Sequence, residues 1–135
     1  MALERSELIN LVEMAMKKVN VVPFEENTIQ FGTNMAAVSL SKSAVMVCDC
    51  YLNVVNEGRT CHVGFSAVLS DAVASEFYFC VDGSERPKRY KNTNATMNFT
   101  DFFLLNTGLH HIEVKAVAES PAVIEPREAR LGVYL

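Results

Sequence analysis

From residue 28 onward, apolar and polar residues alternate with a period of about two, which is the side-chain period of a β-strand. Turn-forming residues interrupt this alternation at short intervals. Eight segments are expected to form strands: 28–33, 36–41, 44–55, 60–69, 76–82, 95–105, 110–118 and 130–135. Because no helical spacing separates these segments, they predict a mainly β domain, an antiparallel β-sandwich with either jelly-roll or immunoglobulin-like strand order.

Three glycines lie at breaks in this alternation. Gly58 follows Asn-Glu, Gly83 follows Asp82, and Gly108 follows Asn-Thr. Glycine adopts a positive φ without steric cost, and tight hairpin turns need that conformation. We therefore expect Gly58, Gly83 and Gly108 to be structural turn residues.

The first 22 residues have helical spacing instead. This helix is expected to end before Pro23, because the residue ahead of a proline avoids the helical region. Its apolar stripe is too wide for a free surface helix, so we expect it to pack on the sandwich or on copies of itself. The expected docking or oligomerisation residues are Leu8, Ile9, Val12, Met16 and Val19. The chain is thus divided into a helix over 1–22 and a β-sandwich domain over 23–135.

The expected strands carry more apolar faces than one sandwich needs. In the segment 44–55, one face is expected to be core and the opposite face is apolar as well. These two faces consist of Met46, Cys48, Cys50 and Leu52, and of Val45, Val47 and Tyr51. The segment 76–82 is also apolar on both faces, so it should lie inside the structure or face a neighbouring subunit. Surplus apolar faces are typical of subunit interfaces and favour a small cyclic oligomer.

Net charge and cysteine content indicate which binding partners and which cellular compartment to expect. A net charge of −4 disfavours nucleic acid and anionic membranes. The basic cluster 86–91 is expected to be a solvated turn. No apolar run reaches the ~20 residues of a membrane span, and the N-terminus lacks a signal-peptide pattern. We therefore expect a chain in a reducing cytosol, with its four cysteines as free core thiols.

The candidate catalytic pairs do not converge. Cys61 and His62 are neighbours in an expected strand, as are His110 and His111, so the members of each pair point to opposite faces. His110 is expected at the edge of the core, donating to a carbonyl across the sheet, and His111 on the polar face. The cysteine spacing is unlike the paired C-x2-C of zinc sites. We expect no enzyme activity, no catalytic residue, no cofactor and no metal site.

The stretch NTNATMNFTD, residues 92–101, is dense in amide and hydroxyl side chains. It contains two glycosylation sequons, at Asn94 and Asn98, and one charged residue, Asp101. Such density is typical of a solvated loop or an edge strand. Because loops of this kind also hold sugars, a lectin-like role stays open.

Residues 76–135 contain a recurrent strand pattern. FYFCVDG ends one strand, and two later strands carry the rest of the pattern: Gly108, His110, Ile112 and Val114, then Leu131, Val133 and Leu135. This pattern resembles the β-sandwich modules of bacteriophage virion proteins. The resemblance implies a non-enzymatic viral structural protein, a capsid decoration, head-fibre or tail-fibre subunit. It further implies a homotrimer that has no cofactor, binds other virion proteins and is made in the host cytoplasm before it enters the virion.

Two alternatives compete with this hypothesis. The first is a carbohydrate- or receptor-binding β-sandwich module of a phage tail, with a host-surface glycan as partner. It needs a groove with exposed aromatic side chains or a calcium site, and the chain contains no tryptophan. The second is an enzyme, which needs clustered His, Asp, Glu or Cys side chains. The virion hypothesis predicts large apolar faces between subunits and an oligomer in solution.

Overall fold

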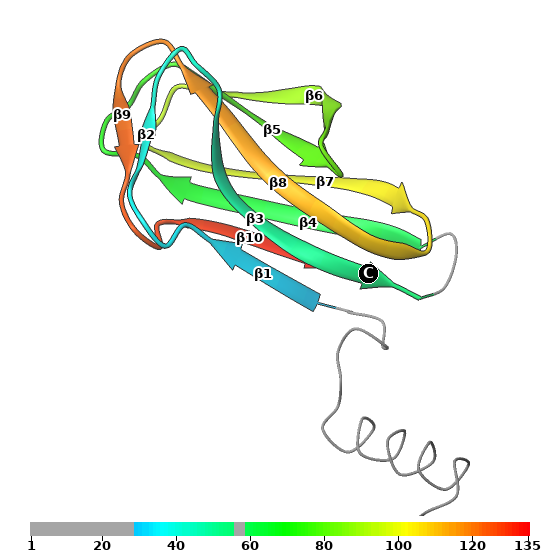
Figure 1. Ribbon diagram of the computed structural model, residues 1–135. Coiled ribbons are helices and arrows are strands. Elements are labelled where there is room, and N and C mark those ends of the chain that lie inside the picture. The colour runs from blue at the N-terminus through cyan, green and yellow to red at the C-terminus, as the bar shows by residue number, and fades with distance from the viewer. Residues whose placement is uncertain (1–28, 56–58) are drawn as a thin grey trace, which may run out of the picture.

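The computed structural model describes residues 29–55 and 59–135, which form two four-stranded antiparallel sheets packed face to face (Figure 1). Sheet 1 has the strand order β1 (Ile29–Thr33), β10 (Ala129–Tyr134), β4 (Arg59–Val68) and β7 (Thr96–Leu105). Sheet 2 has the strand order β3 (Val45–Val54), β8 (Gly108–Ala118), β5 (Ser75–Val81) and β6 (Ser84–Asn92). A ladder of β2 (Val38–Leu40) and β9 (Ala122–Ile124) lies at one end of the sandwich (Figure 1).

The order of the eight long strands, β1-β10-β4-β7 against β3-β8-β5-β6, is that of a jelly roll. The predicted antiparallel β-sandwich is therefore confirmed for the described part of the chain. The helix expected over 1–22 lies outside the described residues, as does Gly58. Its expected interface residues are therefore not placed either: Leu8, Ile9, Val12, Met16 and Val19. The residues that the structure describes include no helix long and apolar enough to span a membrane.

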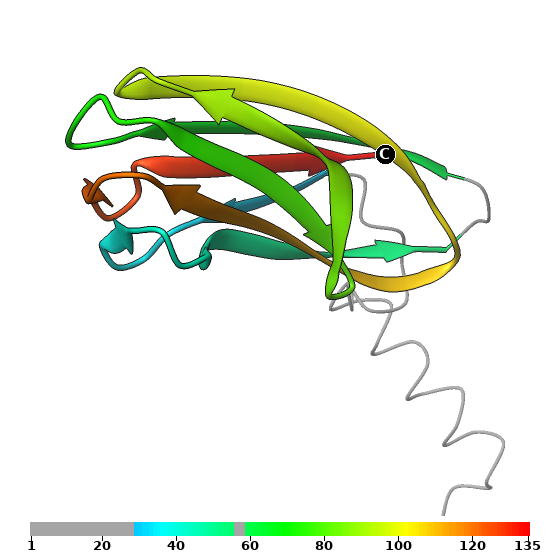
Figure 2. The same ribbon diagram turned by 90° about the horizontal axis from the view of Figure 1, so that it is seen from above.

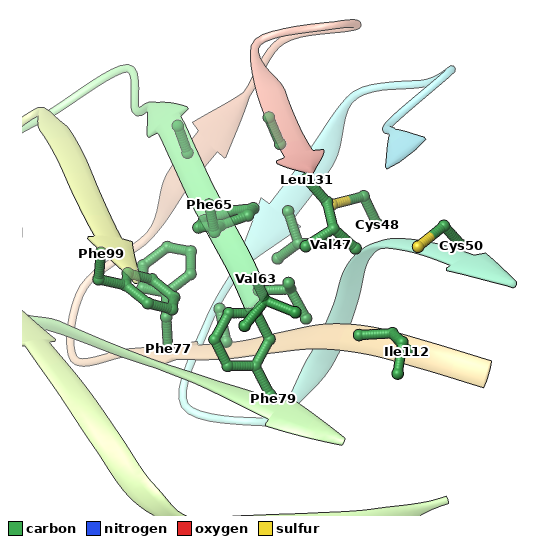
Figure 3. Close-up of a cluster of buried hydrophobic side chains, with 14 of the residues drawn as sticks. Val47, Cys48, Cys50, Val63, Phe65, Phe77, Phe79, Phe99, Ile112 and Leu131 are labelled. Atoms are coloured by element: carbon green, nitrogen blue, oxygen red, sulfur yellow. The ribbon is translucent and has the colours of Figure 1, made fainter. Parts of the chain in front are cut away.

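Four phenylalanine rings form the centre of the core (Figure 3). Phe65 and Phe99 come from sheet 1, and Phe77 and Phe79 come from sheet 2. The ring centroids of Phe65 and Phe99 lie 5.2 Å apart, as do those of Phe79 and Phe99. These pairs are tilted or edge-on, the arrangement that aromatic rings prefer. The cluster therefore joins the two sheets.

Three of the four free cysteines, Cys48, Cys50 and Cys61, lie in this core. Cys80 is also buried, but it lies on the outer side of sheet 2 near Glu113 and Lys115, so the expectation of a core thiol is wrong for this residue. Burial raises the pKa of Cys48, Cys50 and Cys61 to about 12. Near neutral pH these thiols stay protonated, and a protonated thiol is a poor nucleophile and metal ligand. They pack as small apolar side chains, in line with the expectation of core thiols.

Two different contacts close the open sides of the sandwich. On one side, β1 approaches β3 at Gly32. A Cβ added to Gly32 would overlap the carbonyl oxygen of Asp49 and lie 2.9 Å from its carbonyl carbon. On the other side, the Tyr90 ring of β6 stacks on Phe99 of β7 at a centroid distance of 4.1 Å. The Tyr90 hydroxyl donates to the carbonyl oxygen of Thr100 at 3.2 Å.

The start of β3 departs from the predicted alternation. Its register against β8 shifts between Met46 and Cys48, as in a β-bulge, so that Val47 and Cys48 are both buried. Met46 and Tyr51 are exposed. The prediction that Met46 shares the core face with Cys48 and Leu52 is therefore wrong, because the extra residue reverses the phase of the strand.

Residues 86–91 form the middle of β6 rather than the solvated turn that was predicted. Seen from above, β5 and β6 form a hairpin (Figure 2). Its turn is confined to Asp82 and Gly83, which have φ values of 53° and 83°. Gly108, the other expected turn glycine in the described chain, has a φ of 128°. Strand β6 is an edge strand with Pro87 and several basic residues, features that discourage pairing with another chain.

Candidate functional site

A polar groove lies between the end of β6, residues 93–95 and the start of β7. Its volume is about 420 Å³, which is within the range of small-ligand sites. We call it the amide groove, because three asparagines line it. Its lining residues are Arg89, Tyr90, Lys91, Asn92, Asn94, Thr96, Met97, Asn98 and Phe99.

Asn92 shapes the turn that ends the groove. Its Nδ2 donates to the carbonyl oxygen of Asn94 at 2.6 Å, and its Oδ1 accepts from the backbone N–H of Asn94 at 3.3 Å. Asparagine commonly folds a turn in this way. The Asn92 amide is thus occupied within the chain. The side chains of Asn94 and Asn98, in contrast, form no hydrogen bond with any described residue.

Strand β7 places the other polar groups of the groove. Thr96 and Asn98 are two residues apart, so both side chains point to the outer surface of sheet 1, where both are exposed. Met97 and Phe99, between and after them, point into the core and are buried. The alternation of β7 therefore separates the polar rim of the groove from its apolar base.

The Tyr90 ring supplies the aromatic part of the groove. Burial raises the pKa of Tyr90 to about 12, with a further contribution from the nearby Asp101 carboxylate, so the hydroxyl stays protonated and donates to Thr100. One face of the ring stacks on Phe99, and the ammonium group of Lys88 lies 4.9 Å from the ring centroid. An exposed cation of this kind adds only about 0.5–1 kcal/mol, so a ligand can displace it.

Basic side chains border the groove. The Arg89 guanidinium is held by Glu85 at 2.8 Å and by Glu76 at 3.4 Å, and it lies over the Tyr78 ring. The hydrogen bond with Glu85 raises the pKa of Arg89. Lys91 forms no ion pair with the described residues. The border thus offers one fixed and one free cationic donor.

A second hollow, of about 680 Å³, lies beside the amide groove and shares Lys91 and Asn92 with it. Its charged lining residues include Lys42, Glu76 and Glu119. No aromatic side chain is among its lining residues. The amide groove is therefore the better candidate for a ligand that combines hydroxyl groups with an apolar face.

His110 lies at the opposite end of β6 from the groove. Its Nδ1 is 2.6 Å from Oδ2 of Asp82, and its Nε2 is 2.7 Å from the carbonyl oxygen of Asn106. The expected carbonyl partner thus lies in its own turn, four residues earlier, and not across the sheet. Burial alone lowers the pKa of His110, but the hydrogen bonds with Asp82 and Asn106 outweigh it and the pKa is raised. Burial of Asp82 is likewise outweighed by hydrogen bonds from the His111 backbone and from His110, so the pKa of Asp82 is lowered.

His111 has a separate carboxylate partner. Its Nε2 is 2.6 Å from Oδ2 of Asp49, and its ring stacks on Tyr51 at a centroid distance of 4.4 Å. Within residues 29–55 and 59–135, no three His, Cys, Asp or Glu side chains come together in a way that could hold a metal ion. The rings of the adjacent histidines thus have different carboxylate partners, Asp82 for His110 and Asp49 for His111.

The outer surface of sheet 1 carries a set of large apolar side chains. We call this set the apolar face; it consists of Ile29, Phe31, Phe102, Leu104 and Tyr134. The sequence indicated a surplus of apolar positions, yet it could not tell which side of 102–105 faces the core, because both sides are apolar. The structure buries Phe103 and Leu105 and leaves Phe102 and Leu104 exposed.

These observations define a jelly-roll β-sandwich with a polar groove at one edge. No protein-family model and no curated protein sequence matches the chain. The structure is similar to a family 35 carbohydrate-binding module from Clostridium thermocellum, with a TM-score of 0.52 at 10% identity over 79% of this chain and 98% of that one. The CBM36-1 domain of a multidomain xylanase from the hindgut metagenome of Trinervitermes trinervoides gives a TM-score of 0.51 at 12% identity over 78% and 95% of the chains.

A third similar structure is the C-terminal domain of EclA, a sugar-binding protein, with a TM-score of 0.51 at 13% identity over 73% of this chain and 79% of that one. At these identities the likeness shows the fold alone. The chemistry of this chain has to be argued from its own residues.

Proposed function

We propose that the protein is a non-catalytic carbohydrate-binding β-sandwich module and that the amide groove holds the sugar. The observation that carries the proposal is the set of amide and hydroxyl groups of Asn94, Thr96 and Asn98, which have no partner among the described residues and line the same groove as the stacked Tyr90 and Phe99 rings. An amide combines two donors with an acceptor, and a hydroxyl does both. Such groups match the hydroxyl groups of a sugar, which are also both donors and acceptors.

We expect a sugar ring to use both the polar and the aromatic residues of the groove. Hydroxyl groups at the edge of the ring would bond to Asn94 and Asn98, while its C–H face would lie on Tyr90 in place of the Lys88 ammonium. The three solved structures described above are a family 35 module, a CBM36-1 domain and a sugar-binding protein by name, which supports the same function class. Lys91 adds a free donor at the rim for a hydroxyl or a carboxylate.

The expected affinity for one sugar ring is low. A hydrogen bond to a neutral group contributes about 0.5–1.5 kcal/mol net, so three side chains contribute on the order of 3 kcal/mol. The contact with the Tyr90 ring adds about 1 kcal/mol. The total of about 4 kcal/mol corresponds to a Kd of about 1 mM. Longer saccharides and several copies of the module would raise the apparent affinity.

Affinity electrophoresis tests the proposal. The protein is run in native gels cast with soluble xylan, pectin, β-glucan or galactomannan, and we expect at least one of them to retard it. Asn94→Ala and Asn98→Ala should each weaken that retardation about fivefold to tenfold, since each removes about one hydrogen bond. Asn106→Ala is the matched control, because it removes an exposed asparagine amide at the opposite end of β7.

Two results would contradict the proposal. One is that no polysaccharide alters the migration of the protein and that the protein also binds nothing on a printed glycan array. The other is a polysaccharide that binds Asn94→Ala and Asn98→Ala as tightly as it binds the Asn106→Ala control.

A second proposal rests on the apolar face. We propose, following the resemblance of residues 76–135, a structural subunit of a virion, a capsid decoration or fibre subunit that self-associates and binds other virion proteins. Five large exposed apolar side chains on one sheet are typical of such a surface. A host-surface glycan would then be the ligand of the amide groove. Mass spectrometry of purified virus particles from cells that express the chain tests this role, and particles that lack the chain would contradict it.

A further inference from the structure

The apolar face is at the upper end of the apolar patches that monomeric proteins expose. Its members have these exposed fractions: Ile29 56%, Phe31 78%, Phe102 66%, Leu104 66% and Tyr134 50%. With ~150–250 Å² for a whole aromatic side chain and somewhat less for an aliphatic one, these fractions leave about 600 Å² in water. Monomers rarely expose contiguous patches beyond a few hundred Å², and a standard interface buries about 800 Å² per partner. The face therefore has the size of an interface core.

Strand register makes most of this face contiguous. Ile29 is directly opposite Tyr134, Tyr134 is opposite His62, and His62 is opposite Phe102. The His62 ring stacks on Tyr134 at a centroid distance of 5.3 Å and lies 6.2 Å from the Phe102 ring. A row of side chains thus crosses all four strands of sheet 1.

Beside this row the sheet has a hollow. Gly64 and Gly132 are cross-strand neighbours in the next row. A Cβ added to Gly64 would have only the Thr100 methyl group within 4 Å, at 3.9 Å, so the space above Gly64 is open. A Cβ on Gly132 would meet the Phe31 ring at 3.8 Å. Protruding rings and an open hollow therefore lie side by side on one surface.

This combination fits a second copy of the chain. A two-fold interface uses the same patch on both subunits, so the patch must offer both a protrusion and a hollow. Among the outward positions of sheet 1 that the structure describes, Arg130 is the single Lys, Arg, Asp or Glu. Two such faces meet with little like-charge repulsion, although the chain as a whole has a net charge of −4.

The opposite surface of the sandwich is different. On sheet 2 the Arg89 guanidinium covers the Tyr78 ring at 4.3 Å and is itself held by Glu85 and Glu76. Tyr78 is buried in consequence. Sheet 2 thus covers Tyr78 with charged side chains, although it leaves Met46, Tyr51 and Leu109 exposed. On sheet 1, no described side chain covers the apolar face in this way.

Association by edge pairing is blocked on the β6–β7 side. Oδ1 of Asp101 accepts the backbone N–H of Phe102 at 2.8 Å, and the Tyr90 hydroxyl donates to the carbonyl of Thr100. These bonds occupy two groups of the β7 edge that another strand would need. Contact through the face is therefore favoured over extension of the sheet.

We propose that the apolar face of sheet 1 packs against the same face of a second copy, so that the chain forms a two-fold dimer. The two sheets lie face to face, and the rings of each copy fill the glycine hollow of the other. The amide groove stays accessible, because its β7 residues, Thr96 and Asn98, lie at the other end of the strand from Phe102 and Leu104. The dimer therefore presents two sugar sites.

Sedimentation velocity of the full chain from about 2 to 200 µM tests the dimer. The wild-type protein should sediment with roughly twice the mass of one chain, which is 15.0 kDa. Leu104→Lys and Phe102→Lys should weaken dimerisation at least ~100-fold, because each buries a charge in the interface. Leu109→Lys is the matched control: Leu109 is as exposed as Leu104, at 66%, but it lies on sheet 2, so the dimer should persist.

A wild-type monomer at 200 µM overturns the proposal, as does a trimer. Equal dimerisation of Leu104→Lys and Leu109→Lys, with unchanged circular dichroism, also overturns it. The proposal does not depend on sugar binding. Asn94→Ala should lose polysaccharide binding at unchanged mass, and Leu104→Lys should lose the dimer while each monomer still binds polysaccharide. If Leu104→Lys instead abolished all polysaccharide binding, the apolar face would be the sugar site and the dimer proposal would be wrong.

Discussion

The replacement Gly32→Ala should destabilise the protein although it adds a single methyl group. The new Cβ would overlap the carbonyl oxygen of Asp49 and lie 2.9 Å from its carbonyl carbon. The obstacle is backbone and not a flexible side chain, so no rotamer change relieves it. Strand β1 has to move away from β3, and that movement opens one side of the sandwich.

The size of the effect follows from two opposing terms. Overpacking a close contact costs about 1–3 kcal/mol, and a backbone obstacle places this case near the upper end. Replacing glycine by alanine also restricts the unfolded chain, which returns about 0.4–1 kcal/mol. We expect a net loss of about 2 kcal/mol in the free energy of unfolding. For a domain of this size that is a fall in Tm of about 6–10 °C.

Gly64→Ala is the matched control for this prediction. Gly64 is also in a strand, but its added Cβ would make only an ordinary contact with Thr100 at 3.9 Å. At protein concentrations too low for dimerisation, the Tm of Gly64→Ala should stay the same as that of the wild type or rise slightly. Thermal unfolding of both variants by circular dichroism, with urea titration for the free energy, measures the difference. A Gly32→Ala variant as stable as Gly64→Ala would refute the close approach of β1 to β3.

Two further predictions concern polar contacts. The pKa of His110 is raised, so its pairing stabilises the fold fully below pH 6.5, and this stabilisation is lost as the pH rises through the raised pKa. The pKa of Asp82 is lowered, so its pairing stabilises the fold above pH 3.8, and this stabilisation is lost as the pH falls through the lowered pKa. Asp82→Asn should therefore flatten the fall in Tm between pH 6 and 8, and a fall as steep as in the wild type would contradict the pair. Asp101→Thr frees the Phe102 N–H at the β7 edge, where a strand of another chain can then pair. Turbidity at 37 °C should therefore rise faster than in the wild type at similar Tm. Equal turbidity would show that the Asp101 hydrogen bond does not prevent edge pairing.

Most of the strands could be predicted from the sequence, because they bury one side and leave alternate residues outside. Strand β6 could not, since SERPKRYKN is an edge strand whose polar and charged residues resemble those of a loop. Strand β9 has only three residues, too few for a pattern. The phase of β3 was predicted wrongly at Met46, because a bulge adds one residue without any mark in the sequence.

The candidate site was partly visible in the sequence. The density of amides in 92–101 marked a solvated segment that could hold sugar, and the groove contains Asn92, Asn94 and Asn98. The contribution of Tyr90 could not be predicted, since it depends on β6 of sheet 2 lying beside β7 of sheet 1, and no sequence pattern indicates that these two strands are neighbours. The partners of His110 and His111 are 28 and 62 residues away, at Asp82 and Asp49, beyond the reach of local spacing.

The most direct test of sugar binding in the amide groove is to observe the side-chain amides themselves. In ¹⁵N-labelled protein, the Nδ2 resonances of Asn94 and Asn98 are followed during titration with an oligosaccharide from whichever polysaccharide retards the protein most. The account predicts that these two resonances shift along one saturation curve, while the Asn106 resonance, at the other end of β7, stays in place. Shifts confined to Phe31, Phe102 and Tyr134, with Asn94 and Asn98 unchanged, would contradict it.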